Sequence, residues 1–127
     1  MEAQRASGTV LVVDDDALLR LAIVDEFKRA GWSVLEAATG EGALVSAKDC
    51  VVDVLFTDIQ LGGDLTGWDL AEALDRDHPG VLVIYASGTR PNLGRMLPGA
   101  QFVSKPYDMA AVVRSCGAPA RKGGRLG

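Results

Sequence analysis

The chain has 127 residues, of which 48% are hydrophobic and 24% charged, the ordinary balance of one globular domain. This composition excludes a disordered, collagen-like or coiled-coil chain, and no apolar run approaches the roughly 20 residues that cross a bilayer. The net charge of −4 understates an acidic body, because Arg121, Lys122 and Arg125 lie at the C-terminal end. We therefore expect no nucleic-acid and no membrane partner and, without a secretory signal at the N-terminus, a cytoplasmic location.

The first half of the chain alternates predicted strands and helices. Residues 1–8 are small and polar, and we expect them to be disordered. Strands are predicted over 9–13, 33–37 and 51–57, and helices over 17–30 and 40–48. The first strand is continuously apolar instead of alternating, which is typical of a parallel sheet that is covered on both faces.

The second half continues this alternation with one gap. A helix over 68–77, strands over 81–86 and 101–104, and a helix over 109–116 are predicted. Residues 89–99 hold Pro91 and Pro98, so a full helix between the last two strands is not expected. Glycines from residue 117 onward indicate a flexible tail over 117–127, which leaves a domain over 9–116. Cys50 and Cys116 lack metal-like spacing and are expected to be reduced thiols.

Polar residues stand where the predicted strands end. Asp14, Asp15 and Asp16 follow the first strand, and Asp58 follows the third. The fourth strand leads to Ser87 and the fifth to Lys105. Because strands that alternate with helices predict a parallel α/β sheet, these side chains would meet at one edge, where such sheets bind ligands.

The residue types at this edge suit phosphoryl chemistry. Two carboxylates about 5 Å apart repel by roughly 3 kcal/mol at an effective dielectric of 20, so the cluster favours a bound cation such as Mg²⁺. A carboxylate can also serve as the nucleophile that takes a phosphoryl group. A lysine and a hydroxyl such as Lys105 and Ser87 can neutralise and bind the transferred group.

Each feature also has a plainer explanation when taken alone. The aspartate triplet could simply cap a helix, with Asp16 complementing its dipole. Ser87 and the glycine after it could form only a turn, and Phe102 could be an ordinary core residue. The combination of carboxylates, hydroxyl and lysine at successive strand ends favours a site over these readings.

From about residue 8 to residue 116 the chain resembles the receiver domain of two-component response regulators. The resemblance rests on four segments together: VLVVDDD with its lead-in, VLFTDIQL, VIYASG and FVSKPY. It implies a flavodoxin-like (CheY-like) three-layer α/β sandwich, with a five-stranded parallel sheet of order 2-1-3-4-5 and helices on both faces. Receivers of hybrid kinases and single-domain regulators are the variants that it is most similar to.

The resemblance also implies a role for each site residue. Asp58 corresponds to the phosphoacceptor, and Asp14 and Asp15 to the acidic pair that binds Mg²⁺ (or Mn²⁺) together with Asp58. The backbone carbonyl of Gln60 would complete the protein ligands of the metal. Beyond the metal, Ser87 corresponds to the switch hydroxyl, Lys105 to the lysine that binds the phosphoryl group, and Phe102 to the switch aromatic.

Two departures from the family pattern affect these expectations. The loop after Asp58 is about one residue longer and lacks the usual proline, which predicts a more mobile loop. The segment between Ser87 and Lys105 is about one helical turn shorter than usual, so the fourth helix of the family is expected to be short or absent. That helix belongs to the family's output surface, and the coupling of Asp58 to output is therefore open.

Three functions remain for comparison. The first is a phosphorylation-controlled switch that takes its phosphoryl group from a sensor histidine kinase or a histidine phosphotransfer protein and signals to an unidentified downstream protein. In this reading the domain is no enzyme beyond its own phosphorylation and dephosphorylation, and residues 117–127 are too short for an output domain. The second is a binding module that does not depend on phosphate. The third, a phosphohydrolase, lacks an evident lid and substrate pocket.

Overall fold

The computed structural model describes residues 8–118, so most of the expected disordered segment over 1–8 and of the expected tail over 117–127 lies outside the described part. The expectation of disorder is wrong for Gly8, which is buried and whose carbonyl accepts from the backbone N–H of Ser33 at 2.9 Å. The strands are β1 (Thr9–Val13), β2 (Ser33–Ala37), β3 (Val54–Asp58), β4 (Leu82–Ser87) and β5 (Gln101–Ser104). The helices are α2 (Ala17–Arg29), α3 (Gly40–Ala47), α4 (Gly67–Asp77) and α5 (Met109–Ser115). None of the described helices is long and apolar enough to cross a membrane.

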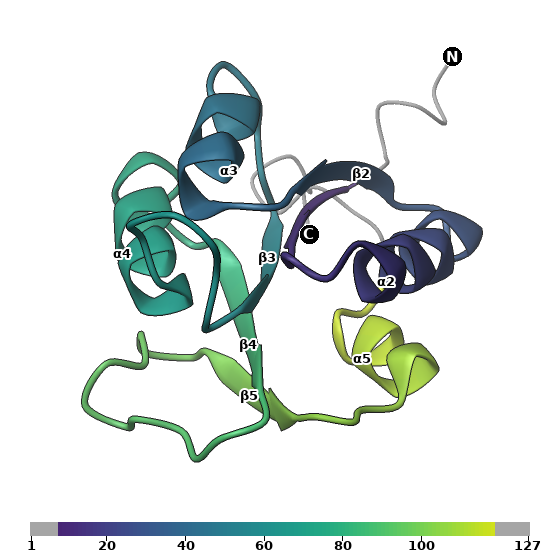
Figure 1. The fold of residues 1–127 in the computed structure, drawn as a ribbon. Coiled ribbons are helices and arrows are strands. Elements are labelled where there is room, and N and C mark those ends of the chain that lie inside the picture. Colours follow the sequence, from purple (N-terminus) through teal and green to yellow (C-terminus); the bar gives the residue numbers. More distant parts are fainter. Residues whose placement is uncertain (1–7, 119–127) are drawn as a thin grey trace.

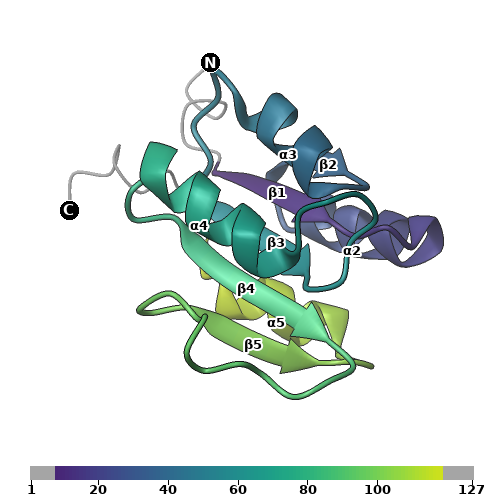
Figure 2. The same ribbon diagram turned by 60° about the vertical axis from the view of Figure 1, so that its left-hand side comes forward.

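The five strands form one parallel sheet of order β2-β1-β3-β4-β5, which confirms the predicted topology (Figure 2). Helices α3 and α4 lie on one side of the sheet, and α2 and α5 lie on the other (Figure 1). The predicted three-layer α/β sandwich is therefore confirmed. Its parallel strands direct all their carboxyl ends to one edge.

The two helical layers bury alternate residues of the same strands. In β1, Leu11 and Val13 belong to the core beneath α3 and α4, while Val10 and Val12 belong to the core beneath α2 and α5. This is the period of two that a strand imposes on its side chains. Because both sets are apolar, the strand reads as a continuous hydrophobic run in the sequence.

Two strand boundaries differ from the prediction in a way that matters for the site. β3 begins at Val54, not at Val51, and ends with Asp58 as its last residue. β4 likewise includes Ser87. Both side chains are therefore held by the hydrogen-bonded sheet itself and not by the loops that follow.

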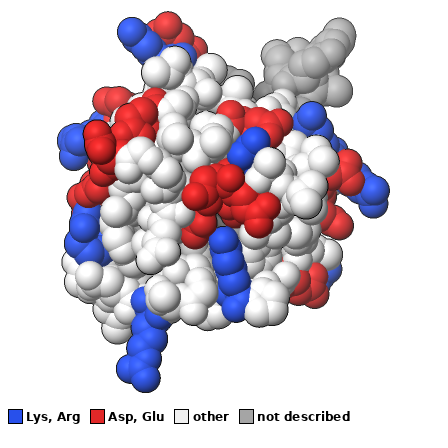
Figure 3. All heavy atoms as spheres, viewed as in Figure 1, with Lys and Arg blue, Asp and Glu red and all other residues white. Residues whose placement is uncertain are grey.

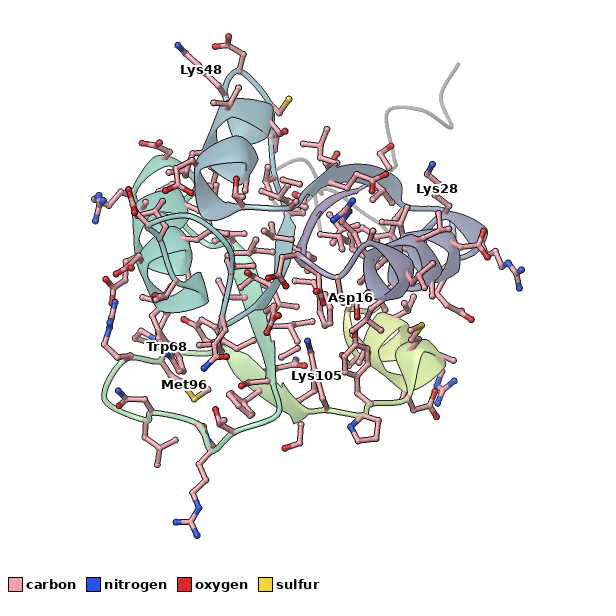
Figure 4. All side chains as sticks on the ribbon, in the orientation of Figure 1. Asp16, Lys28, Lys48, Trp68, Met96 and Lys105 are labelled. Atoms are coloured by element: carbon pink, nitrogen blue, oxygen red, sulfur yellow. The ribbon has the colours of Figure 1, made fainter. Side chains whose placement is uncertain are left out.

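The connection between β4 and β5, residues 88–100, contains no helix, as the sequence predicted. The side chain of Arg95 fastens it to α4, with 3.1 Å contacts to the carboxylates of Asp69 and Glu72. Further along, the backbone N–H of Leu97 donates to the Tyr85 hydroxyl at 3.4 Å. Figure 4 shows Met96 of this segment beside Trp68 of α4. Contacts that involve side chains therefore fix this segment, where helical hydrogen bonds are absent.

The loop between β3 and α4 is tethered at several points. Gly62 forms an isolated bridge with Thr39, and the carboxylate of Glu41 accepts a hydrogen bond from the backbone N–H of Asp64 at 2.9 Å. The backbone N–H of Gly67 donates to the carbonyl of Ile59 at 2.7 Å. The first two contacts join the segment after Asp58 to the beginning of α3, and the third joins the two ends of the loop. The predicted mobility of this loop stays a prediction.

Replacing Gly67 by alanine should destabilise the fold. An added Cβ would lie 2.3 Å from the backbone oxygen of Asp58 and 2.9 Å from the Cα of Ile59. Although alanine favours helices, overpacking against rigid backbone costs about 1–3 kcal/mol, and we expect a loss of that size in urea unfolding. Gly62→Ala is the control, since nothing lies within 4 Å of its added methyl. Equal stability of the two variants would contradict this packing argument.

Candidate functional site

Four neighbouring strands deliver the predicted site residues to the carboxyl edge of the sheet. Asp14 follows β1, Asp58 ends β3, Ser87 ends β4 and Lys105 follows β5. The sheet register aligns them, because Asp58 pairs with Ala86 and the backbone N–H of Lys105 donates to the carbonyl of Ser87 at 2.9 Å. Residues separated by up to 91 positions in sequence thus become neighbours.

Three carboxylates form a cluster at the centre of this edge. One oxygen each from Asp14, Asp15 and Asp58 lies within 4.8 Å of the other two. Asp14 is fully buried, Asp58 is 8% exposed, and Asp15 is open to solvent. Figure 3 shows acidic side chains gathered at the centre of this face, with a basic side chain reaching them from below.

The ammonium group of Lys105 is the basic partner of this cluster. Its Nζ lies 3.2 Å from Oδ2 of Asp58 and 3.6 Å from Oδ2 of Asp14. Figure 4, in the same orientation as Figure 3, shows the lysine side chain extending toward the carboxylates. The Lys105–Pro106 peptide bond is cis. One cation therefore faces two buried carboxylates, and the third has no such partner among the described residues.

The hydrogen bonds of Asp14 leave one oxygen available. Its Oδ1 accepts from the backbone N–H of Asp16 at 2.9 Å, whereas its buried Oδ2 has no hydrogen-bond partner among the described residues. A buried acceptor without a donor is costly, and a cation would satisfy it. Together with the oxygen-only donor set, this fits a hard divalent ion such as Mg²⁺. The acidic cluster could therefore hold a metal ion.

The third aspartate of the triplet has the plainer role that the sequence also allowed. Asp16 is the N-cap of α2, and its carboxylate accepts from the backbone N–H groups of Leu18 and Leu19. Asp16 therefore caps a helix, while Asp14 and Asp15 belong to the carboxylate cluster.

The hydroxyl of Ser87 is directed toward the segment that follows β4. It lies 3.0 Å from the hydroxyl of Thr89 and accepts from the backbone N–H of the same residue at 3.1 Å. Ser87 is 3% exposed, whereas Thr89 is exposed, so both hydrogen bonds lie where the buried strand meets the surface. The geometry ties the beginning of the 88–100 segment to the last residue of β4.

The remaining two predicted residues, Gln60 and Phe102, lie in different elements. Gln60 follows Asp58 by two residues in the loop at the same edge, with an exposed side chain. Phe102 lies in β5, opposite Tyr85 of β4 in the sheet register. Its ring is partly buried and packs against the core beneath α3 and α4, on the side that the 88–100 segment borders.

Burial raises the pKa of Asp58 above its ordinary value, because desolvation disfavours the charged carboxylate. The positive charge of Lys105 opposes this effect, and the negative charges of Asp14 and Asp15 add to it. A buried carboxylate with a raised pKa is a poorly solvated and therefore reactive oxygen nucleophile once it is deprotonated.

The sequence analysis missed two arginines that support the site. Arg20 of α2 donates to the backbone carbonyl of Asp14 at 2.7 Å, and Arg95 fastens the 88–100 segment to α4. Neither belongs to a motif, since each contact depends on how distant elements pack. A weak signal was present only for the second contact, because Thr66 and Asp69 have the spacing of a helix capping box.

The fold and this edge define a class of signalling domain. The chain belongs to the response regulator receiver domain family, whose pattern it matches over residues 10–116. This confirms the family resemblance drawn from the four sequence segments.

Individual relatives agree with this assignment. The chain is 32% identical to the probable transcriptional regulatory protein TcrX of Mycobacterium tuberculosis, over 87% of this chain and 50% of the relative. It is 28% identical to the chemotaxis protein CheY of Thermotoga maritima, over 84% of this chain and 92% of that protein. The structure is similar to a response regulator receiver protein from Sinorhizobium medicae, with a TM-score of 0.82 and 25% identity over 87% of this chain and 91% of that one.

Several of these relatives are longer proteins. The chain spans 50% of TcrX and 11% of the sensor kinase CckA of Brucella abortus, to which it is 30% identical. Receiver domains therefore occur within both regulators and kinases among the relatives of this chain.

Replacing Asp58 by asparagine should stabilise the protein at neutral pH. The raised pKa means that ionised Asp58 opposes folding, so the native state is favoured when this carboxyl is protonated. The amide removes that penalty at pH 7, and the gain should vanish as pH falls below the ordinary aspartate value of about 4. Thermal unfolding from pH 3.5 to 7.5 measures the difference.

Asp25→Asn provides the control for this measurement. Its carboxylate is exposed and pairs only with Arg29 on the same helix at 3.0 Å, so its replacement should change the unfolding temperature little. A lower unfolding temperature for Asp58→Asn than for the wild type at pH 7 would contradict the assignment of a penalty to Asp58.

Proposed function

We propose that this receiver domain accepts a phosphoryl group on Asp58 from a phosphohistidine, and that phosphorylation switches its contacts with another protein in a two-component phosphorelay. The donor would be a sensor histidine kinase or a histidine phosphotransfer protein. The observation that carries the proposal is the Asp58 carboxylate, which ends β3, is 8% exposed and lies 3.2 Å from Nζ of Lys105. Two further carboxylates flank it.

The transfer step follows from this arrangement. A carboxylate oxygen of Asp58 attacks phosphorus and forms an O–P bond, which gives an acyl phosphate. The N–P bond of the phosphohistidine breaks, and its electron pair stays on the imidazole nitrogen, which then takes a proton from solvent. Hydrolysis later returns the carboxylate and inorganic phosphate. On this proposal the domain acts on no substrate other than its own phosphoryl group.

A divalent cation, Mg²⁺ or Mn²⁺, is the proposed cofactor. The carboxylates of Asp14, Asp15 and Asp58, together with the backbone carbonyl of Gln60, would hold it. Bound there, it would supply positive charge against the negative oxygens of the phosphoryl group. Oδ2 of Asp14 supports this assignment, since that buried oxygen has no hydrogen-bond partner among the described residues and lies 3.6 Å from the ammonium of Lys105.

Lys105 and Ser87 would bind the oxygens of the transferred group. Lys105 is held near Asp58 by opposite charge, so its ammonium can follow the charge from the carboxylate to the phosphoryl oxygen. Ser87 would donate its hydroxyl to another oxygen and would then lose its contacts with Thr89. This exchange would change the beginning of the 88–100 segment. Phe102, which borders that segment, is the proposed switch aromatic.

The proposal also covers the domain bounds, the cellular location and the downstream partner. We propose a receiver domain over residues 9–116. A cytoplasmic location is proposed together with the expected phosphohistidine donor. The downstream partner is a protein that recognises one of the two states.

A phosphorylation-independent binding module is the second candidate. The observation that favours it is the helix-free segment 88–100, which replaces the region that couples phosphorylation to output in the family. Side chains of Arg95 and Tyr85 hold this segment without any contribution from a phosphoryl group. Such a module would bind its partner equally in both states.

Incubation with phosphoramidate and Mg²⁺ should add one phosphoryl group to the wild type and none to Asp58→Asn. The amide of the variant lacks the nucleophilic oxygen charge, and chelation of Mg²⁺ should abolish the adduct on the wild type. Intact-mass measurement reads both outcomes. Asp25→Asn is the matched control and should be labelled like the wild type, since its carboxylate is exposed on α2. Stoichiometric labelling of Asp58→Asn would overturn the assignment.

Beryllofluoride with Mg²⁺ distinguishes the switch from the constitutive module. As a phosphoryl mimic on Asp58, it should draw the Ser87 hydroxyl away from Thr89 and speed hydrogen exchange at the Thr89 amide. Two-dimensional NMR measures this exchange, and the amide of Val112 in α5 serves as the reference because its bond is to the Asp108 carbonyl. Binding of the mimic without any change at Thr89 would favour the module.

A further inference from the structure

Arg20 occupies an unusual position for a surface arginine. It is the fourth residue of α2, and its side chain turns back past the beginning of the helix to the end of β1. Nη1 donates to the backbone carbonyl of Asp14 at 2.7 Å, and Nε lies 3.2 Å from Oε1 of Glu36 in β2. One guanidinium therefore joins a helix, the loop after β1 and the neighbouring strand.

The burial of this side chain separates it from an ordinary exposed charge. The side chain of Arg20 is 20% exposed, whereas that of Arg29 on the same helix is 73% exposed. A charge-assisted hydrogen bond of 2.7 Å is short, and it forms where water competes little. The contact is thus a defined geometric restraint and not a solvated surface pair.

The location of Arg20 does not favour helix stability. A cation within the first turn opposes the positive end of the helix dipole, at a cost of about 0.3–1 kcal/mol. The first turn of α2 contains no acidic residue, and the carboxylate of the N-cap Asp16 accepts from backbone N–H groups of the helix. The benefit of Arg20 must therefore lie in what its side chain contacts outside the helix.

Hydrogen bonds hold the backbone on both sides of the Asp14 Cα. The N–H of Asp14, in the Val13–Asp14 peptide, donates to the carbonyl of Ala37 at the end of β2 at 3.2 Å, and the C=O of Asp14, in the Asp14–Asp15 peptide, accepts from Arg20. The bond from Arg20 is therefore the one that restrains the peptide plane joining Asp14 to Asp15. That plane sets the directions in which the two side chains leave the backbone, one buried and one exposed, toward the same cluster.

We propose that Arg20 is a positioning residue for the divalent-cation site, which holds the Asp14–Asp15 peptide in the orientation that lets both carboxylates reach the ion. The inference rests on the proposed function of the cluster. It assigns to this arginine a role that acts through a backbone carbonyl, without contact with the ion or the phosphoryl group.

Geometry and charge predict opposite effects of losing this arginine. If Arg20 acted only as a nearby positive charge, it would repel a divalent cation, and its removal would tighten Mg²⁺ binding. If it acts by holding the peptide, its removal would weaken Mg²⁺ binding. Loss of outer-shell partners of metal ligands typically weakens binding by about 10–100-fold.

The test compares Mg²⁺ affinity by titration calorimetry in the wild type, Arg20→Gln, Arg20→Lys and Arg29→Gln. Lysine keeps the charge but presents one compact ammonium in place of the planar fork that reaches two acceptors. Arg29→Gln removes the same charge from the same helix, at an exposed ion pair. Circular dichroism at the titration temperature confirms that each variant is folded.

We expect Arg20→Gln to weaken Mg²⁺ binding by about 10-fold, with Arg20→Lys close to it and Arg29→Gln close to the wild type. Unchanged or tighter binding by Arg20→Gln would overturn the proposal, as would wild-type affinity in Arg20→Lys. Should Arg20→Gln fail to fold, Arg20→Lys decides alone by the same criterion. Absence of saturable Mg²⁺ binding in the wild type would instead refute the proposed cation site itself.

Discussion

The concentration of negative charge at one edge of the sheet is the constraint on which the site depends. Two nearly buried carboxylates and a third exposed one lie within 4.8 Å of each other, and Lys105 is their basic neighbour. Parallel strands create this crowding, because they bring every carboxyl end to the same edge. The same crowding makes the edge receptive to a cation, and it adds to the burial that is the main cause of the raised pKa of Asp58.

The surrounding fold keeps these groups close despite their repulsion. Asp58 is part of a hydrogen-bonded strand, and Gly67 lets the beginning of α4 approach its backbone. Arg20 and the N-cap Asp16 hold the loop after β1 from its two sides. Because each restraint acts on the backbone, the three carboxylates stay close together without needing favourable contacts among themselves.

The segment between β4 and β5 links the site to a surface that differs from the usual receiver. It begins at the hydroxyl of Ser87 and is fastened to α4 by Arg95 and to Tyr85 by a backbone hydrogen bond. A segment held by a few side chains and not by helical hydrogen bonds has few restraints to break. A change at Ser87 would therefore act on a segment that only a few side-chain contacts hold, which suits a switch as well as a fixed module.

By itself the sequence determined the elements and the residue types of the site. Apolar runs that end in Asp14, Asp58 and Lys105 indicated a parallel α/β sheet with its chemistry at one edge, and Pro91 and Pro98 indicated that the helix between the last two strands would be short or absent. Periodicity and strand endings are local properties, so they can be read from one chain. Only the tertiary structure decided which side chains support the site, as with the Arg20 contact to the Asp14 carbonyl. Such contacts depend on the packing of elements far apart in sequence, which no local pattern encodes.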